Sequence, residues 1–338
     1  MKAKLPWLAH FTTAGLMFVS VGSRLGRWHR LLELVSSFQL QLFVGAILLA
    51  VVFACLRKWR HLAVVLGCAC LSGAACAVGW QSVEADRQTP GKRWRLLQFN
   101  VDWENEPQGR YPRLVKLLQD VNADVVVMQE VTESLEPGTR DVHSIYPYRY
   151  IEPTGGSGGT AVFSRWPLVT TEIADVGNFA STSVRVDVMI HNIPVAILTA
   201  HAPTPFGQNF NKRNEQLRRM GEYAAQMPAP KIVAGDFNAT MWSPYFQAMR
   251  QTAHLRDVRA GHGLLPTWPT RYPSRLLRIP IDHCLLSHDL IVTNVQIGTD
   301  VGSDHFPLIV DLAFTAARQY AFGQLRSCCI PRDPYHSW

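Results

Sequence analysis

The sequence predicts an α/β domain that is rich in strands and is preceded by apolar helices that cross a membrane. Two observations support this prediction. Beyond residue 93, short apolar runs alternate with longer amphipathic stretches, which is the pattern of strands and helices in α/β folds. Before residue 81, long apolar runs contain almost no charged side chains, which is typical of helices inside a bilayer.

The charged residues divide the chain at the same place. Residues 1–93 contain 11 Lys and Arg against 3 Asp and Glu, whereas residues 94–338 contain 22 against 23. The net charge of +7 therefore comes from the apolar N-terminal part. A second part that is close to neutral does not favour wholesale electrostatic capture of duplex DNA.

Residues 1–80 are predicted to form a membrane anchor of two or three helices. Residues 34–56 carry no charge, and at ~1.5 Å per residue they span a ~30 Å hydrocarbon layer. Residues 62–80 form the partner of this helix. Residues 5–22 are a third candidate, for which a surface helix and a cleaved signal peptide are the alternatives. The polar residues 81–93 are predicted to be a linker.

The short basic turn at residues 57–60 predicts the orientation of the anchor. Positive turns stay preferentially in the cytoplasm, which places residues 94–338 on the opposite face of the membrane. The arginines and lysines at residues 24–30 and 87–95 oppose this orientation, because they would lie outside.

Eight strands and two helices are predicted in the second part. The helices are residues 110–121 and 209–226, where apolar side chains recur at helical spacing. The strands are residues 94–101, 125–128, 160–163, 184–190, 195–200, 232–235, 281–286 and 308–312. We therefore expect a catalytic domain at residues 94–315 and a C-terminal tail at 316–338. The tail contains Cys328 and Cys329, to which we assign no role, since the cysteines show no disulfide framework or zinc spacing.

Polar side chains recur where the predicted strands end. The run LLQFNVDWEN ends an apolar strand with Asn100 and Asp102, and DVVVMQEV leads directly into Gln129 and Glu130. A run of the second kind is buried on both faces, so its terminal carboxylate points into the crevice where ligands bind in α/β folds. The alternative is a solvated strand end.

The run IVAGDFNAT is the most specific of these motifs. Gly235 permits close approach of the backbone, and Asp236 and Asn238 point the same way because they lie two residues apart. A carboxylate beside an amide can align a water molecule and hold a phosphoryl oxygen. A simple Asx turn would not require this pair.

Two histidines and a buried carboxylate complete the candidate site. The run LTAHAPTP places His201 at a strand end, and IPIDHCLLS places Asp282 inside an apolar run, where a carboxylate needs a partner. We pair Asp282 with His305 of VGSDHFPL. A carboxylate on one ring nitrogen raises the basicity of the other and produces a general base.

Two competing interpretations of the motifs are disfavoured. The GGSGG run at residues 155–159 is not followed by the Lys-Ser or Lys-Thr pair of a phosphate-binding loop, so a flexible turn is predicted. A Ser/His/Asp acyl-transfer triad is disfavoured because we find no nucleophile elbow.

Taken in order, FNVD, QEV, HAP, GDFN, IDH and GSDH resemble the signature of the endonuclease/exonuclease/phosphatase superfamily over nearly all of residues 94–338. The resemblance implies a four-layer sandwich of two mixed β-sheets flanked by helices, with the active site at one sheet edge. It also implies a hydrolase of phosphate esters that uses Mg²⁺ or Mn²⁺. No covalent intermediate is expected.

By position, the resemblance implies that Glu130 is the principal metal ligand. Asn100 is expected to support it, and Asp102 and Asp304 are expected to do so through water or a second ion. Asp236 and Asn238 would position or deprotonate the attacking water and bind the phosphoryl group. His305, oriented by Asp282, would act as the base, and His201 would contact the phosphate or assist the leaving group.

The apolar N-terminal segments and the runs WHRLLELVSSFQLQLF and PTWPTRYPSRLLRIPIDH resemble a membrane-bound bacterial branch of the superfamily. This resemblance implies an integral protein of the inner membrane, with the catalytic domain on the extracytoplasmic face. The QEV run lacks the lysine that follows Gln-Glu in many apurinic endonucleases, which disfavours a dedicated role in DNA repair.

Three functions remain open at this point. A phosphodiesterase or endonuclease acting on nucleic acid is favoured, and the cations that could contact its phosphates are Lys212, Arg213, Arg218, Arg219, Arg271, Arg275 and Arg278. A hydrolase of lipid headgroups or small phosphodiesters is the alternative, suggested by the anchor and by Trp268, Tyr272 and Leu276. A binding module without catalysis is disfavoured because every expected catalytic position is retained. No protein partner is inferred.

Overall fold

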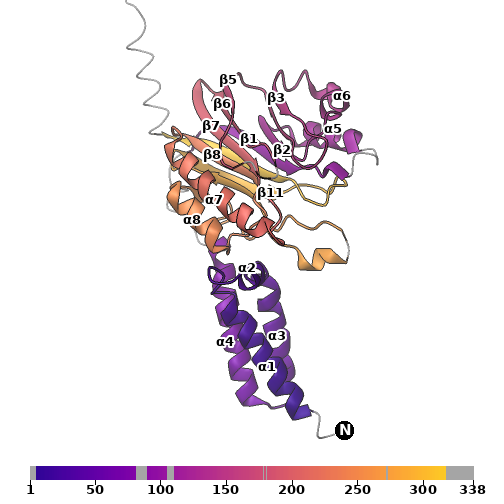
Figure 1. Ribbon diagram of the computed structural model, residues 1–338, viewed down its shortest axis with the longest axis vertical. Helices are drawn as coiled ribbons and strands as arrows, with labels where there is room; N and C mark the ends of the chain where they lie inside the picture. The colour runs from indigo at the N-terminus through magenta and orange to yellow at the C-terminus, as the bar shows by residue number, and fades with distance from the viewer. Residues whose placement is uncertain are drawn as a thin grey trace, which may run out of the picture.

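A computed structural model describes residues 5–80, 90–104, 110–177, 179, 181–271 and 273–316. A bundle of helices lies at one end of the molecule and a β-sandwich at the other (Figure 1). Most of the predicted linker and the tail with Cys328 and Cys329 lie outside the described residues, as does Tyr272.

The bundle consists of helices from the N-terminal part of the chain. The elements are α1 (Leu5–Gly22), α2 (Arg30–Ser36), α3 (Gln39–Cys55), α4 (Trp59–Cys76) and η1 (Ala77–Trp80). Among the described residues, α4 is long and apolar enough to cross a membrane, and α2 with α3 would count as a second span if the bent pair is one span. The apolar helix at residues 7–22 is shorter than this test requires.

The predicted span at residues 34–56 is broken instead of continuous. Helices α2 and α3 meet at an angle of 73°. Polar side chains lie at the break: Ser36 Oγ donates to the carbonyl of Glu33, and the buried amide of Gln39 donates to Ser23 Oγ at 3.0 Å. The straight apolar helix therefore begins at Gln39, and α2 turns toward the sandwich.

The sandwich contains two six-stranded mixed sheets. The first has the order β11-β12-β1-β2-β4-β3 and the second β5-β6-β7-β8-β10-β9. Each contains one parallel pair, β1–β2 and β7–β8, and the other pairs are antiparallel. The first sheet comprises β1 (Pro90–Asn100), β2 (Val125–Gln129), β3 (Tyr148–Glu152), β4 (Thr160–Ser164), β11 (Leu290–Ile297) and β12 (Leu308–Thr315). The second comprises β5 (Leu168–Ile173), β6 (Val184–Ile190), β7 (Ile193–His201), β8 (Lys231–Asp236), β9 (Arg256–Asp257) and β10 (Asp282–Leu286).

Helices cover the outer face of each sheet, so the predicted four-layer sandwich is confirmed. The first sheet is covered by α5 (Arg110–Val121), with α6 (Leu135–Gly138) and η4 (Arg140–Val142) nearby, and the second by α7 (Asn209–Gln226) and α8 (Pro244–Thr252). Valine, isoleucine and leucine side chains from the facing sheets form the central core. All eight predicted strands and both predicted helices are present.

The bundle is tied to the sandwich by a buried ion pair. Glu33 Oε1 of α2 lies 2.9 Å from Arg213 Nη2 of α7, and each side chain is only 1% exposed. The indole of Trp242 also donates to the carbonyl of Ala75 at 3.1 Å, and Cys76 packs into the core beside α7 and α8. Arg213 is therefore not available to bind phosphate, contrary to the sequence-based expectation for this residue.

The buried pair predicts a large effect of substitution. Arg213→Ala leaves the carboxylate of Glu33 buried without a counter-charge, so we expect it to lower the free energy of unfolding by about 3–5 kcal/mol. Lys212→Ala is the matched control, because Lys212 is the exposed neighbour on the same helix. Thermal denaturation of the full chain in detergent measures both variants, and equal midpoints for the two would contradict the prediction.

Candidate active site

Strand ends from the two sheets meet at one edge of the sandwich. Asn100 ends β1, Glu130 follows β2, and Asp236 ends β8. The amide nitrogen of Asn100 donates to Glu130 Oε1 at 3.0 Å and to Asp236 Oδ2 at 3.1 Å. One neutral side chain therefore holds a carboxylate from each sheet.

Left-handed backbone conformations direct these side chains into the site. Asp102, Glu130 and Asn238 have φ angles of 58°, 59° and 46°. Such conformations are uncommon outside glycine and concentrate at functional sites. Gly235 has a φ of 150°, and a Cβ there would lie 1.9 Å from the carbonyl oxygen of Ala200. The glycine before Asp236 is required by this close approach.

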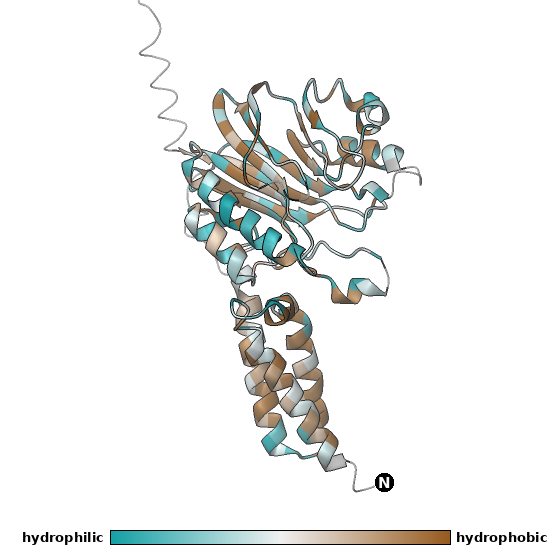
Figure 2. Cartoon of the chain, viewed as in Figure 1, coloured by the Kyte–Doolittle hydropathy of each residue, from teal (hydrophilic) through white to brown (hydrophobic). Residues whose placement is uncertain are grey.

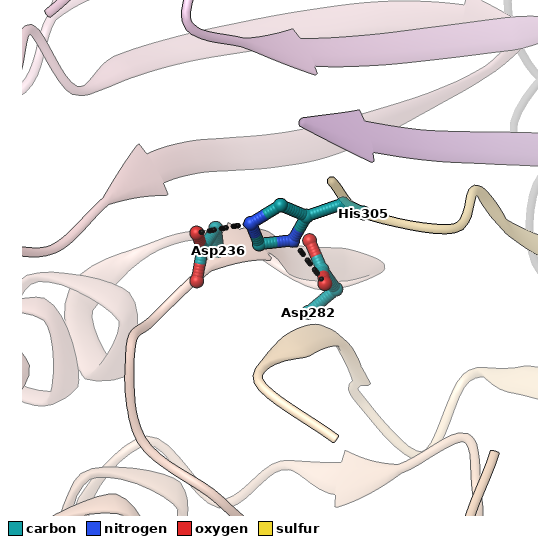
Figure 3. A group of neighbouring side chains, drawn as sticks. All are labelled: Asp236, Asp282 and His305. Atoms are coloured by element: carbon teal, nitrogen blue, oxygen red, sulfur yellow. Dashed lines mark hydrogen bonds and ion pairs between the residues drawn. The ribbon is translucent and has the colours of Figure 1, made fainter. Parts of the chain in front are cut away.

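The predicted pair of Asp282 and His305 is present (Figure 3). His305 Nδ1 lies 2.8 Å from Asp282 Oδ2, and its Nε2 lies 3.6 Å from Asp236 Oδ2. Asp282 and Asp236 are register partners on β10 and β8. The imidazole thus lies between two buried carboxylates.

Asp282 is oriented by a polar network between the sheets that the motifs did not reveal. Gln98 of β1 donates from Nε2 to Asp282 Oδ1 at 3.1 Å and to Gln129 Oε1 at 2.8 Å. Gln129 in turn donates to Thr199 Oγ1 at 2.9 Å. A glutamine in the middle of the apolar run LLQF is the sequence signal for this network, because an amide at a core position needs partners.

The protonation states of His305, Asp236 and Asp282 depend on one another. Burial would lower the pKa of His305, but the carboxylates of Asp282 and Asp236 outweigh it and raise the pKa to about 10. Burial raises the pKa of Asp236 to about 6, although His305 offsets part of this effect. Burial would also raise the pKa of Asp282, but His305 lowers it below its usual value. His305 is therefore protonated at neutral pH in this arrangement.

His201 enters the same site from the end of β7. Its Nδ1 lies 3.2 Å from the carbonyl oxygen of Ser157, which fixes Nδ1 as the donor. Its Nε2 then faces Glu130 Oε1 at 3.7 Å and Asp236 Oδ2 at 3.6 Å. The amide of Asn238 donates to the carbonyl of Ala202 at 2.9 Å, which holds Asn238 beside His201.

Ser157 belongs to the GGSGG run, which matches the letters of a nucleophile elbow. It lies in the loop between β3 and β4, whereas an elbow connects a strand to a helix. The loop lines the site through the carbonyl of Ser157, a contribution that the sequence did not indicate.

Three further carboxylates lie beside this cluster and form an acidic group: Asp102, Glu130 and Asp304. Burial and then the negative charges of Asp304 and Glu130 raise the pKa of Asp102, and Arg271 offsets part of this rise. The backbone N–H of Trp103 donates to Glu130 Oε2 at 3.3 Å. Mutually repelling oxygen donors of this kind suit a hard divalent cation such as Mg²⁺.

A second arrangement of possible metal donors is formed by Asp236, Asp282 and His305, whose donor atoms all lie within 4.8 Å of one another. The ring nitrogen of His305 nearest to Asp282 is already hydrogen-bonded to it. In this trio the imidazole already lies between two carboxylates and offsets their charge. The acidic group around Glu130 is therefore a better site for a cation than the trio.

The two groups line one crevice of about 370 Å³ and are in contact with each other, since His305 Nε2 lies 3.7 Å from Asp304 Oδ1. All the predicted site residues except Asn100 and Asp282 line it, and those two lie directly behind Glu130 and His305. Trp268 also lines it, and its indole N–H donates to Asp304 Oδ2 at 2.8 Å. A pocket of this size with convergent acidic, amide and imidazole groups is suited to a phosphate ester and a cation.

The sequence profile of the Endonuclease/Exonuclease/phosphatase family matches residues 97–305. The chain belongs to this family. The matched range contains every predicted site residue, and it identifies the protein as a hydrolase of phosphate esters. No curated protein sequence matches the chain.

Solved structures of family members share the fold of this phosphoesterase. D. rerio TDP2 complexed with a single-strand DNA product has 19% identity and a TM-score of 0.55, covering 66% of this chain and 99% of that one. The 3' phosphatase NExo from Neisseria, bound to a product DNA hairpin, has 17% identity and a TM-score of 0.54, covering 64% and 98%. A family protein from Beutenbergia cavernae has 19% identity and a TM-score of 0.51, covering 67% and 73%.

The raised pKa of His305 predicts how the stability of the phosphoesterase depends on pH. Because the folded-state pKa of about 10 exceeds the usual value of 6.5, the stabilisation is complete below pH 6.5 and is lost as pH rises through 10. We expect the thermal midpoint of the cation-free chain to decrease as the pH is raised from 6.5 to 10. The decrease should be less steep in His305→Gln.

His254→Gln is the matched control, since His254 is exposed. It should retain the pH dependence of the unmodified chain. Equal slopes for the unmodified chain and His305→Gln would show that the imidazole does not carry the buried positive charge.

Proposed function

We propose that this chain is a membrane-anchored, divalent-metal-dependent phosphodiesterase that cleaves P–O bonds with water. The observation that supports this most strongly is the presence of two different groups in one crevice. Glu130, Asp102 and Asp304 form an oxygen-rich group, and next to it His305 lies between Asp236 and Asp282. A phosphodiester in the crevice would meet both a site for a cation and groups that transfer protons.

Glu130 would hold the cation, supported by the carbonyl oxygen of the Asn100 amide and by Asp102 and Asp304. We expect Mg²⁺, with Mn²⁺ as a substitute, because the donors are all oxygen. When bound, the ion would offset the negative charge that develops on the phosphoryl oxygens in the transition state. The amide of Asn238 would donate to one remaining phosphoryl oxygen, and His201, when protonated on both ring nitrogens, would donate from Nε2 to another.

The buried charges favour different proton roles for Asp236 and His305. The sequence motifs suggested His305 as the base. With a pKa of about 6, Asp236 can accept a proton from the attacking water near neutral pH. Because its own pKa is about 10, His305 would begin the reaction as a cation that binds a phosphoryl oxygen and donates its proton to the leaving oxygen. Asp282 would keep the ring in this orientation.

The N-terminal bundle would hold the enzyme in the membrane. The exposed indoles of Trp7 and Trp59 lie at one end of the bundle, and those of Trp28 and Trp80 lie at the end nearest the sandwich. Tryptophan is enriched at both interfaces of a bilayer. The basic turn at residues 57–60 favours an extracytoplasmic catalytic domain in a bacterial inner membrane.

The structural neighbours suggest nucleic acid as one substrate, since TDP2 and NExo were solved with DNA products. The cations of α7 do not support this choice. Arg218 pairs with Glu215 and Glu222, and Arg219 pairs with Glu215. Of the remaining arginines, Arg271 lies 3.2 Å from the crevice residue Asp102, and Arg275 follows on the same loop; both are exposed and suit phosphates of either a nucleic acid or a lipid headgroup. Both substrate classes are phosphodiesters.

Hydrolysis of bis-p-nitrophenyl phosphate by the full chain in detergent tests the proposed activity. We expect Mg²⁺-dependent release of nitrophenol, and a fall in kcat of roughly 10²–10⁴-fold in Asp236→Asn and Asp282→Asn because each disturbs proton transfer. Asp311→Asn is the control, since this carboxylate pairs with Arg95 on the first sheet away from the crevice. Unchanged rates in both site variants would exclude the proposed chemistry.

A further inference from the structure

Two walls of the crevice also contact the bundle, at the end of the bundle that lies nearest the sandwich. The first wall is the start of α7, where Asn209 lines the crevice and Arg213, one turn later, pairs with Glu33. The second wall includes Trp268 and Ile281 and belongs to residues 267–271 and 273–281, which we call the rim segment. Both walls therefore connect the crevice to the bundle.

The rim segment joins the active site to the anchor at its two ends. Near its start, Trp268 donates to Asp304, and Arg271 Nη2 lies 3.2 Å from Asp102 Oδ2. Near its end, the carbonyl of Arg278 accepts a hydrogen bond of 2.9 Å from Gln41. Gln41 lies in the first turn of α3, where that helix begins.

An apolar tip lies between these two attachment points. The segment forms a helical turn, η5 (Ser274–Leu277), in which Leu276 is 70% exposed and Leu277 is 54% exposed. Figure 2 shows a brown patch at this protruding turn, on the side of the sandwich nearest the bundle. Arginines precede and follow the tip, namely Arg271, Arg275 and Arg278. Two exposed leucines flanked by cations are typical of a segment that enters a membrane interface.

The length of α3 brings the bilayer surface to this tip. A helix of 17 residues extends ~26 Å, which is shorter than a hydrocarbon layer of ~30 Å. If α3 crosses the membrane, the apolar layer must therefore reach the first turn of the helix, where Gln41 contacts the rim segment. Exposed Trp28, Leu31 and Trp80 at the same end of the bundle extend this apolar belt.

We propose that the tip of the rim segment inserts into the bilayer interface and that the active site acts on lipid headgroup phosphodiesters. This inference rests on the proposed phosphodiesterase function and membrane anchor. Leu276 and Leu277 enter the acyl region, while the exposed arginines that precede them, Arg271 and Arg275, meet lipid phosphates. A nucleic acid offers no partner for the leucines, since single strands are bound by aromatic stacking and charge.

The reaction at this surface is a hydrolysis. The oxygen of a water molecule forms a bond to phosphorus, and the bond from phosphorus to one ester oxygen breaks. The ion-paired Asp236 and His305 take up the proton of the water and supply the proton of the departing alcohol. The products are a phosphomonoester and an alcohol, one of which stays in the membrane.

A double variant, Leu276→Asp with Leu277→Asp, separates membrane contact from chemistry. The full chain is reconstituted into phosphatidylglycerol vesicles with Mg²⁺, and turnover of the lipid is compared with turnover of bis-p-nitrophenyl phosphate. We expect at least a tenfold loss of lipid turnover and an unchanged rate with the soluble ester. Val169→Asp with Ile173→Asp is the matched control on the exposed edge strand β5, and it should leave both rates unchanged.

A second measurement decides the membrane contact independently of activity. Benzoylphenylalanine in place of Leu276 should photocrosslink to phospholipid, whereas benzoylphenylalanine in place of Ile173 should not. Absence of crosslinking at Leu276, or equal lipid turnover by the double variant and the unmodified chain, overturns the inference. Cleavage of single-stranded DNA without any lipid turnover also overturns it. If neither ester is hydrolysed while Leu276 crosslinks to lipid, the proposed activity fails and the membrane contact stands.

Discussion

The structure depends on the meeting of carboxylates from two sheets at one edge of the sandwich. Asn100 bridges Glu130 and Asp236 with a single amide, and His305 lies between Asp236 and Asp282. Carboxylates in a buried space repel each other and need compensating charge. The imidazolium of His305 offsets the charge of Asp236 and Asp282. A bound cation would offset the charge of the acidic group around Glu130. The same charge arrangement explains why a negatively charged phosphodiester can enter.

The sequence predicted the inner strands and missed the outer ones. The eight predicted strands are all the inner members of the two sheets, whereas β3, β5, β9 and β11 are the edges. An inner strand is covered on both faces and paired along both sides, so its sequence is a nearly continuous apolar run. The edge strand β5 is largely exposed and contains the polar run TTE, which carries no such signal.

The candidate site shows a similar division. Its nine predicted residues follow from short motifs at strand ends, and the structure brings them together. The supporting contacts of Gln98, Ser157 and Trp268 join segments far apart in the sequence, so no local pattern could reveal them. The pairing of Glu33 with Arg213 has the same origin, because it joins α2 to a helix about 180 residues later in the chain.

The central claim is that a divalent cation binds at Glu130, apart from the hydrogen-bonded pair of Asp282 and His305. Anomalous X-ray diffraction from crystals of the full chain soaked in Mn²⁺ alone tests it most directly. The account predicts one dominant peak within coordinating distance of the Glu130 carboxylate, with Asp282 and His305 still hydrogen-bonded to each other. A dominant peak bound by Asp282 and His305, or no peak in the crevice, would contradict it.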